Sequence, residues 1–216
     1  MRRLIAALIA ILLLVLPASA ADWSGIFDRT KFSVASLFSD AGSCTAFSID
    51  QGRRHYLTAD HCIATDGTMA FWKEGIPGFN TQGTFDVVRV LQRSKELDAA
   101  VVEGSIGLPA LMPGPEPKIG SELASIGYAL GEPAPWIFGS LVASVKDARS
   151  YGQTRRIIFR DNQDVMGVSG GPVVDRQGRV VAMVQQGLVV DGRMTNIAFG
   201  TSIKQLREFA RIYWRA

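Results

Sequence analysis

The chain has 216 residues, of which 47% are hydrophobic and 20% are charged, with 23 Lys and Arg against 20 Asp and Glu. This composition excludes a disordered chain, and two cysteines exclude a small scaffold held by many disulfides. A pI of about 9.0 and a mean hydropathy of +0.15 would suit a membrane or nucleic-acid binder, so the location of the charge and of the apolar residues matters.

The first twenty residues contribute a large part of the net positive charge and of the apolar residues behind the positive mean hydropathy. Arg2 and Arg3 precede an apolar run of 13 residues, which is followed by Pro17 and the small residues 18–20. These are the parts of a secretory signal peptide. A helix of that run spans about 20 Å, less than a hydrocarbon core of about 30 Å, so cleavage after Ala20 is favoured over an uncleaved anchor. Cleavage leaves 21 Lys and Arg against 20 Asp and Glu, a formal net charge of +1, because residues 1–20 contain no acid.

The rest of the chain consists mainly of short apolar or β-branched runs between turn residues, which predicts an all-β barrel or sandwich with antiparallel strands. The predicted strands are residues 32–38, 46–49, 56–58, 68–71, 84–91, 99–102, 122–126, 136–145, 155–159, 171–174, 180–185 and 197–201. Residues 105–120 contain four prolines, which cannot donate to a strand ladder, so this segment is expected to connect two halves of similar size. At the end of the chain, Ser202 can cap an amphipathic helix that we expect to pack on the second half.

The chemistry of the chain is limited by its two histidines, His55 and His61. Glycines surround Ser169, and they permit a tight turn that aims the N–H groups of Gly167 and Ser169 at an oxyanion. The same pattern matches the nucleophile elbow of α/β-hydrolases, but that fold needs a histidine after the serine, and none follows Ser169. This leaves an arrangement in which the histidine precedes the serine in the chain, with His61 as the base.

Such a histidine needs a carboxylate that orients it, placed between His61 and Ser169 in the chain. Asp98 opens the apolar run 99–102, so it is expected to be interior and to need a specific partner. Asp86 is the next choice. The remaining candidates are Asp66, Asp147, Asp161 and Asp164.

Three segments in this order resemble the chymotrypsin-like (trypsin-like) serine endopeptidases. They are Leu57-Thr-Ala-Asp-His-Cys62, Leu97-Asp-Ala-Ala-Val101 and Gly167-Val-Ser-Gly-Gly-Pro172. The resemblance implies two antiparallel six-stranded β-barrels, residues 21–110 and 111–216, with the active site in the cleft between them and a terminal helix on the second.

The resemblance also implies the roles of the site residues. His61 is general base and then acid, Asp98 orients it, Ser169 attacks the scissile carbonyl, and Gly167 and Ser169 form the oxyanion hole. No metal and no organic cofactor is needed. The family has a disulfide where Cys44 and Cys62 stand, so we expect these two to pair, with two buried free thiols as the alternative.

Two departures from the zymogen-activated members agree with each other. The expected mature N-terminus near Ala21 is not of the Ile-Val-Gly-Gly type, and Val168 replaces the aspartate that would pair with it. Both point to a bacterial branch similar to the HtrA-like and glutamyl-endopeptidase-like groups, here expected without a PDZ domain. A third departure, Asp60 before His61, is expected to face solvent, as is His55.

The residues that would set substrate specificity are expected in two segments, one before Ser169 and one after it. By resemblance the substrate pocket would involve Gln163, Asp164, Gln185 and Gly187, and Asp164 would favour a basic residue if it faced the pocket. The function predicted is an exported serine endopeptidase, secreted or periplasmic, whose partners are protein or peptide substrates and not nucleic acid or, after cleavage, membrane. A protease-like peptide-binding or scaffold protein with an unused site is the alternative.

Overall fold

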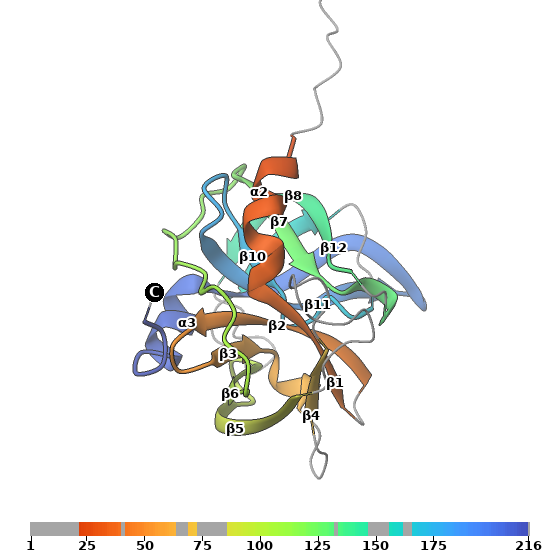
Figure 1. Cartoon of the computed structure of the whole chain (residues 1–216). Helices are drawn as coiled ribbons and strands as arrows, with labels where there is room; N and C mark the ends of the chain where they lie inside the picture. Colours follow the sequence, from red (N-terminus) through yellow and green to blue (C-terminus); the bar gives the residue numbers. More distant parts are fainter. Residues whose placement is uncertain are drawn as a thin grey trace, which may run out of the picture.

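The computed structural model describes residues 22–39, 42–63, 69–72, 86–131, 134–146, 156–161 and 166–215. These residues form two closed antiparallel β-barrels of six strands each, with a short helix near either end (Figure 1). The prediction of an all-β chain with two barrels is confirmed. The predicted signal peptide at residues 1–20 lies outside the described residues.

The first barrel is built from the first half of the chain. Its strands are β1 (Val34–Ser39), β2 (Gly42–Asp50), β3 (His55–Thr58), β4 (Met69–Trp72), β5 (Asp86–Ser94) and β6 (Ala99–Glu103). Their spatial order is β1-β2-β3-β6-β5-β4, and pairing of β1 with β4 closes the barrel. Because β3 lies between β2 and β6, residues that follow β3 lie close to residues that precede β6.

The second barrel repeats this arrangement. Its strands are β7 (Glu122–Gly127), β8 (Trp136–Lys146), β9 (Arg156–Asp161), β10 (Pro172–Val174), β11 (Val180–Val190) and β12 (Arg193–Ser202). Their spatial order is β10-β11-β12-β9-β8-β7, and pairing of β10 with β7 closes the barrel. Each of the twelve predicted strands overlaps one of these twelve, and the main differences are that β2, β11 and β12 are longer than predicted.

The proline-rich segment between β6 and β7 is a connection, as predicted, and it packs on the first barrel. The hydroxyl of Ser48 on β2 donates to the carbonyl of Leu108 at 2.8 Å, and the N–H of Leu111 donates to the carbonyl of Ser48 at 2.9 Å. Leu108 and Leu111 are both buried. The segment therefore covers β2 before the chain enters the second barrel.

The N-terminal helix α2 (Ser24–Thr30) was not predicted, and it lies over strands of the second barrel (Figure 1). The Arg176 guanidinium stacks on the Trp23 ring at 4.1 Å from the centroid, and it donates to the main-chain carbonyl of Asp22 at 2.9 Å. Seven residues with few periodic apolar positions give a weak helical signal, and tertiary packing of Trp23 and Ile26 stabilises the helix instead.

The C-terminal helix α3 (Ile203–Phe209) is capped by Ser202 as predicted, and it packs against β11 and β12 of the second barrel as expected. The tail after it crosses to the first barrel. Trp214 Nε1 donates to the carbonyl of Leu111 at 3.0 Å, and the Arg215 N–H donates to the carbonyl of Ile49 at 3.2 Å. The terminal segments are thus bound to opposite barrels.

His55 is also placed differently from the prediction. It is 6% exposed, and its ring contacts the edge of the Tyr213 ring with centroids 5.3 Å apart. The tail covers this histidine, so it is a packed residue of the first barrel.

Among the residues that the structure describes, every helix is too short or too polar to span a bilayer.

Candidate active site

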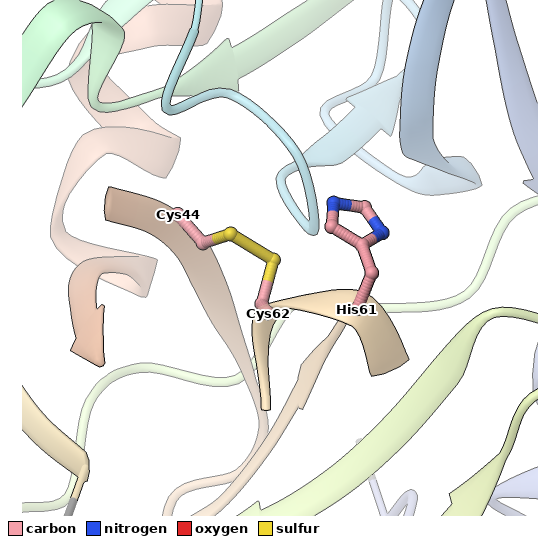
Figure 2. Close-up of side chains that lie close together, drawn as sticks. All are labelled: Cys44, His61 and Cys62. Carbon is pink, nitrogen blue, oxygen red and sulfur yellow. A yellow bond between two sulfur atoms is a disulfide. The ribbon is translucent and has the colours of Figure 1, made fainter. Parts of the chain in front are cut away.

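His61 lies in a short 3₁₀ helix, η2 (Asp60–Cys62), that begins two residues after β3 ends. Cys62 in the same turn forms a disulfide with Cys44 at the start of β2, with the Cα atoms 6.0 Å apart. Figure 2 shows the imidazole of His61 beside this bond. The predicted pairing is confirmed, and it anchors the histidine turn to the neighbouring strand.

Asp98 is held against the same turn. Its Oδ1 accepts a hydrogen bond from the main-chain N–H of His61 at 3.0 Å, and its Oδ2 lies 2.9 Å from His61 Nδ1. The imidazole is 47% exposed, whereas the carboxylate is 15% exposed. The carboxylate therefore fixes both the backbone and the ring of a histidine that keeps one edge open.

This geometry raises the pKa of His61 above its ordinary value. The hydrogen bond that the imidazole donates to Asp98 is the largest cause; partial burial opposes it, and the negative charges of Asp98 and Asp60 add to it.

The other candidate carboxylates cannot be compared with Asp98 at this site. Asp66, Asp147 and Asp164 lie outside the described residues, and the structure describes only the main chain of Asp86 and Asp161.

The turn that carries Asp98 is fixed by the second barrel. Asp98 has φ of +48°, a left-handed conformation that aspartate tolerates better than most residues. The carbonyl of Leu97, just before it, accepts hydrogen bonds from Gln185 Nε2 at 3.1 Å and from Thr201 Oγ1 at 2.8 Å. Two side chains from β11 and β12 thus position a residue of the first barrel.

Ser169 lies in the loop before β10, and this loop requires glycine. Gly167 has φ of +99°, and a Cβ there would lie 2.2 Å from the carbonyl oxygen of Tyr128. Gly170 has φ of +81°, and a Cβ there would lie 2.3 Å from the carbonyl oxygen of Thr45. No side chain fits at either position, so the chain can pass this close to both barrels only because these residues are glycines.

Thr45 on β2 connects the serine loop to the first barrel. Its N–H donates to the carbonyl of Ser169 at 2.8 Å, and its hydroxyl donates to the carbonyl of Gly167 at 2.8 Å. The hydroxyl also accepts from the N–H of Tyr128 at 2.9 Å, and the Thr45 carbonyl accepts from the Thr58 hydroxyl at 2.8 Å. This buried threonine therefore uses all its polar groups to hold the segments around Ser169 and His61.

The N–H groups of Gly167 and Ser169 have no acceptor among the residues that the structure describes. The peptide plane that carries the Gly167 N–H is held from its other side, because the Met166 carbonyl accepts from the N–H of Leu130 at 2.6 Å. The Ser169 hydroxyl itself donates to the carbonyl of Gln185 at 3.1 Å. The loop thus presents two free donors next to a hydroxyl, which is the requirement of an oxyanion site.

The histidine–aspartate pair of the first barrel and the glycine-flanked serine of the second lie close together where the barrels join, since Sγ of Cys62, next to His61, is 3.8 Å from the Ser169 carbonyl oxygen. The family profile described as "Trypsin-like peptidase domain" matches residues 43–183, which include all three. The chain belongs to the trypsin-like peptidase family. The family resemblance noted from the sequence is confirmed, and the peptidase is by this membership a serine endopeptidase.

Solved structures agree on the fold. The active form of the Rv3671c protease from M. tuberculosis has a TM-score of 0.73 at 18% identity, covering 88% of the peptidase and 85% of that chain. The inactive form has a TM-score of 0.71 at 16% identity, covering 91% and 98%. The HtrA-type protease AlgW with a decapeptide has a TM-score of 0.74 at 18% identity, covering 89% and 67%. The comparison with curated protein sequences finds no match.

The predicted pocket residues of the peptidase separate into three groups. Gln163 and Asp164 lie outside the described residues. Gln185 is 2% exposed, and its side chain points to the turn of Asp98, while its carbonyl faces Ser169. Gly187 is half-buried, two residues further along β11. The assignment of these four residues to a substrate pocket stays a prediction.

Cys44, His61 and Cys62 also place three potential metal ligands within 4.8 Å of one another. Both sulfur atoms belong to the disulfide, however, and a metal-binding cysteine must be a thiolate. The cluster therefore supplies only one imidazole as a ligand.

Three contributors to the site were missed from the sequence: Thr45, Thr201 and Arg93. Thr45 and Thr201 are ordinary strand residues whose hydroxyls find partners far away in the chain. Arg93 pairs with Asp60, which is 5% exposed, so the prediction that Asp60 faces solvent is wrong. No local sequence pattern predicts such pairs, because each joins segments that only the tertiary structure brings together.

Proposed function

We propose that this peptidase is an exported protein that cleaves peptide bonds through an acyl-enzyme on Ser169, with His61 as base and acid and Asp98 as its orienting carboxylate. The observation that carries the proposal is the double hydrogen bond from His61 to Asp98 at the barrel junction that also holds Ser169. The leader-like residues 1–20 and the disulfide support export, because disulfides persist in oxidising compartments.

The proposed reaction begins when Ser169 Oγ attacks the carbonyl carbon of the scissile peptide and His61 Nε2 takes its proton. Because Ser169 Oγ donates to Gln185 in the resting structure, the hydroxyl must first rotate toward His61. The negative oxygen of the tetrahedral intermediate accepts from the N–H groups of Gly167 and Ser169. The imidazolium is stabilised by Asp98 while this charge exists.

The intermediate collapses when the bond to the leaving nitrogen breaks and His61 gives that nitrogen its proton. The acyl group remains as an ester on Ser169. Water then attacks the ester, His61 takes a proton from the water, and the second collapse returns the proton to Ser169 Oγ. Protons and electron pairs balance within the triad, so the cycle regenerates the starting enzyme.

A fluorophosphonate probe should label the exported protein on Ser169, because a serine activated by a neutral imidazole attacks phosphorus as it attacks a carbonyl. Mass spectrometry of the labelled protein should place the adduct on Ser169 and the mature N-terminus at Ala21. The Ser169→Ala protein is the control and should not react. A folded wild type that binds peptides but neither labels nor cleaves casein would instead support the peptide-binding alternative.

Activity should fall on acidification with an inflection above the ordinary histidine pKa of about 6.5. Imidazolium cannot accept the serine proton, and the Asp98 hydrogen bond raises the pKa of His61, so the protonated form persists to higher pH. A profile of kcat/KM against pH with a peptide substrate measures this limb. An inflection below 6 would contradict the assignment of His61 as the base.

A further inference from the structure

Asp60 is a buried carboxylate directly before the proposed base. Its side chain is 7% exposed, although it stands at the start of a turn near the surface. A buried carboxylate is costly unless it is paired and hydrogen-bonded. Its partner is Arg93 on β5, whose Nε donates to Asp60 Oδ1 at 2.6 Å.

The Arg93 guanidinium also hydrogen-bonds the main chain on both sides of His61. Its Nη2 donates to the carbonyl of Asp60 at 3.3 Å and to the carbonyl of Ile63 at 3.4 Å. The planar, forked guanidinium group therefore donates hydrogen bonds to a carboxylate and to two carbonyls that flank the segment His61–Cys62. A lysine ammonium is a point charge on a flexible stem and cannot reproduce this fork.

Arg93 and Asp98 belong to the same hairpin. Arg93 pairs with Ala100 across β5 and β6, and the turn between the strands carries Asp98. The hairpin thus holds η2 twice, through Arg93 at its main chain and through Asp98 at the histidine. We infer that Asp60 and Arg93 are positioning residues that keep His61 in register with Asp98 for the proposed reaction.

The charges of the pair act on the same imidazole. The charged side chains that the structure describes around His61 are Asp98, Asp60 and, bonded to Asp60, Arg93. The Asp60 charge contributes to the raised pKa of His61, and the Asp60 hydrogen bond raises the pKa of Arg93, so Arg93 stays charged. Neutralising Asp60 leaves the Arg93 cation without its counter-charge, and the pKa of His61 should fall.

The first arm of the test compares Arg93→Lys with Arg89→Lys. Arg89 is a matched control because it lies on the same strand and binds Glu103 through Nε at 3.1 Å and Nη2 at 2.7 Å, away from η2. Arg93→Lys should lower kcat about tenfold with little change in KM, because a displaced base slows chemistry more than binding. Arg89→Lys should stay within about twofold of wild type.

The second arm follows the His61 imidazole by NMR in the Ser169→Ala background, where the chain's other histidine, buried His55, is an internal reference. Adding Asp60→Asn, which keeps the shape of the side chain, should lower the pKa of His61 by about half a pH unit. This arm needs no activity and uses no Arg93 variant, so it holds even if Arg93→Lys does not fold.

The inference rests on the proposed function, but the two can fail separately. A wild type without hydrolytic activity whose His61 pKa still responds to Asp60→Asn would overturn the proposed function and leave the positioning role standing. Equal kcat for Arg93→Lys and Arg89→Lys in an active enzyme would overturn the positioning role. An unchanged His61 pKa in the Asp60→Asn protein would overturn it as well.

Discussion

Replacing Asp98 with Asn should lower kcat by about 10⁴-fold while leaving the fold intact. An asparagine amide group facing His61 Nδ1 donates where the carboxylate accepts, so the ring is held in the tautomer that cannot take the serine proton. The N–H of His61 can still bond the remaining oxygen, and asparagine tolerates the left-handed backbone at φ of +48°. Steady-state kinetics on a peptide substrate, with circular dichroism for the fold, measures the effect.

Asp191→Asn is a matched control for this substitution. Asp191 has φ of +49°, lies in the turn between β11 and β12, and is not among the hydrogen-bond and charge partners of His61, which are Asp98 and Asp60. Both variants therefore make the same chemical change in the same backbone conformation, and only Asp98 touches the imidazole. Comparable kcat values for the two variants would show that Asp98 is not the orienting carboxylate.

Replacing Gly167 with Ala should cost at least about 10²-fold in kcat, because the oxyanion donor on this residue must move. The new Cβ would lie 2.2 Å from the Tyr128 carbonyl oxygen, and the residue would keep a φ of +99° that side chains disfavour. Relief requires the loop to shift away from Thr45 and Tyr128. The loss should appear in kcat and in the rate of fluorophosphonate labelling, since both need the same donors.

Gly120→Ala separates this clash from the general cost of a side chain at positive φ. Gly120 has φ of +82°, but a Cβ there meets nothing within 4 Å. Its substitution should lower the midpoint of thermal unfolding slightly and leave kcat unchanged. If Gly167→Ala and Gly120→Ala were equally active, the Gly167 N–H would not be an oxyanion donor.

Much of the fold could be predicted because strand positions are a local property. Short apolar or β-branched runs between turn residues indicated all twelve strands, and the prolines at residues 105–120 indicated the connection between the barrels. The short helix α2 was missed because its seven residues depend on Trp23 and Ile26 packing against the second barrel. The exposure of His55 was misjudged because the covering residue, Tyr213, comes 158 residues later.

The sequence by itself determined which residues could do chemistry: two histidines, one glycine-enclosed serine, and the order in which they occur. These follow from side-chain type and from the conformations that glycine allows, which need no knowledge of distant contacts. Only the tertiary structure decided what holds these residues in place. Packing of the two barrels against each other puts Thr45 against Gly167, and Gln185 and Thr201 against Leu97, while strand pairing within the first barrel puts Arg93 against Asp60. Each of these bonds joins segments separated by 33 to 122 residues, and hydrogen bonding between such segments depends on packing that no local pattern encodes.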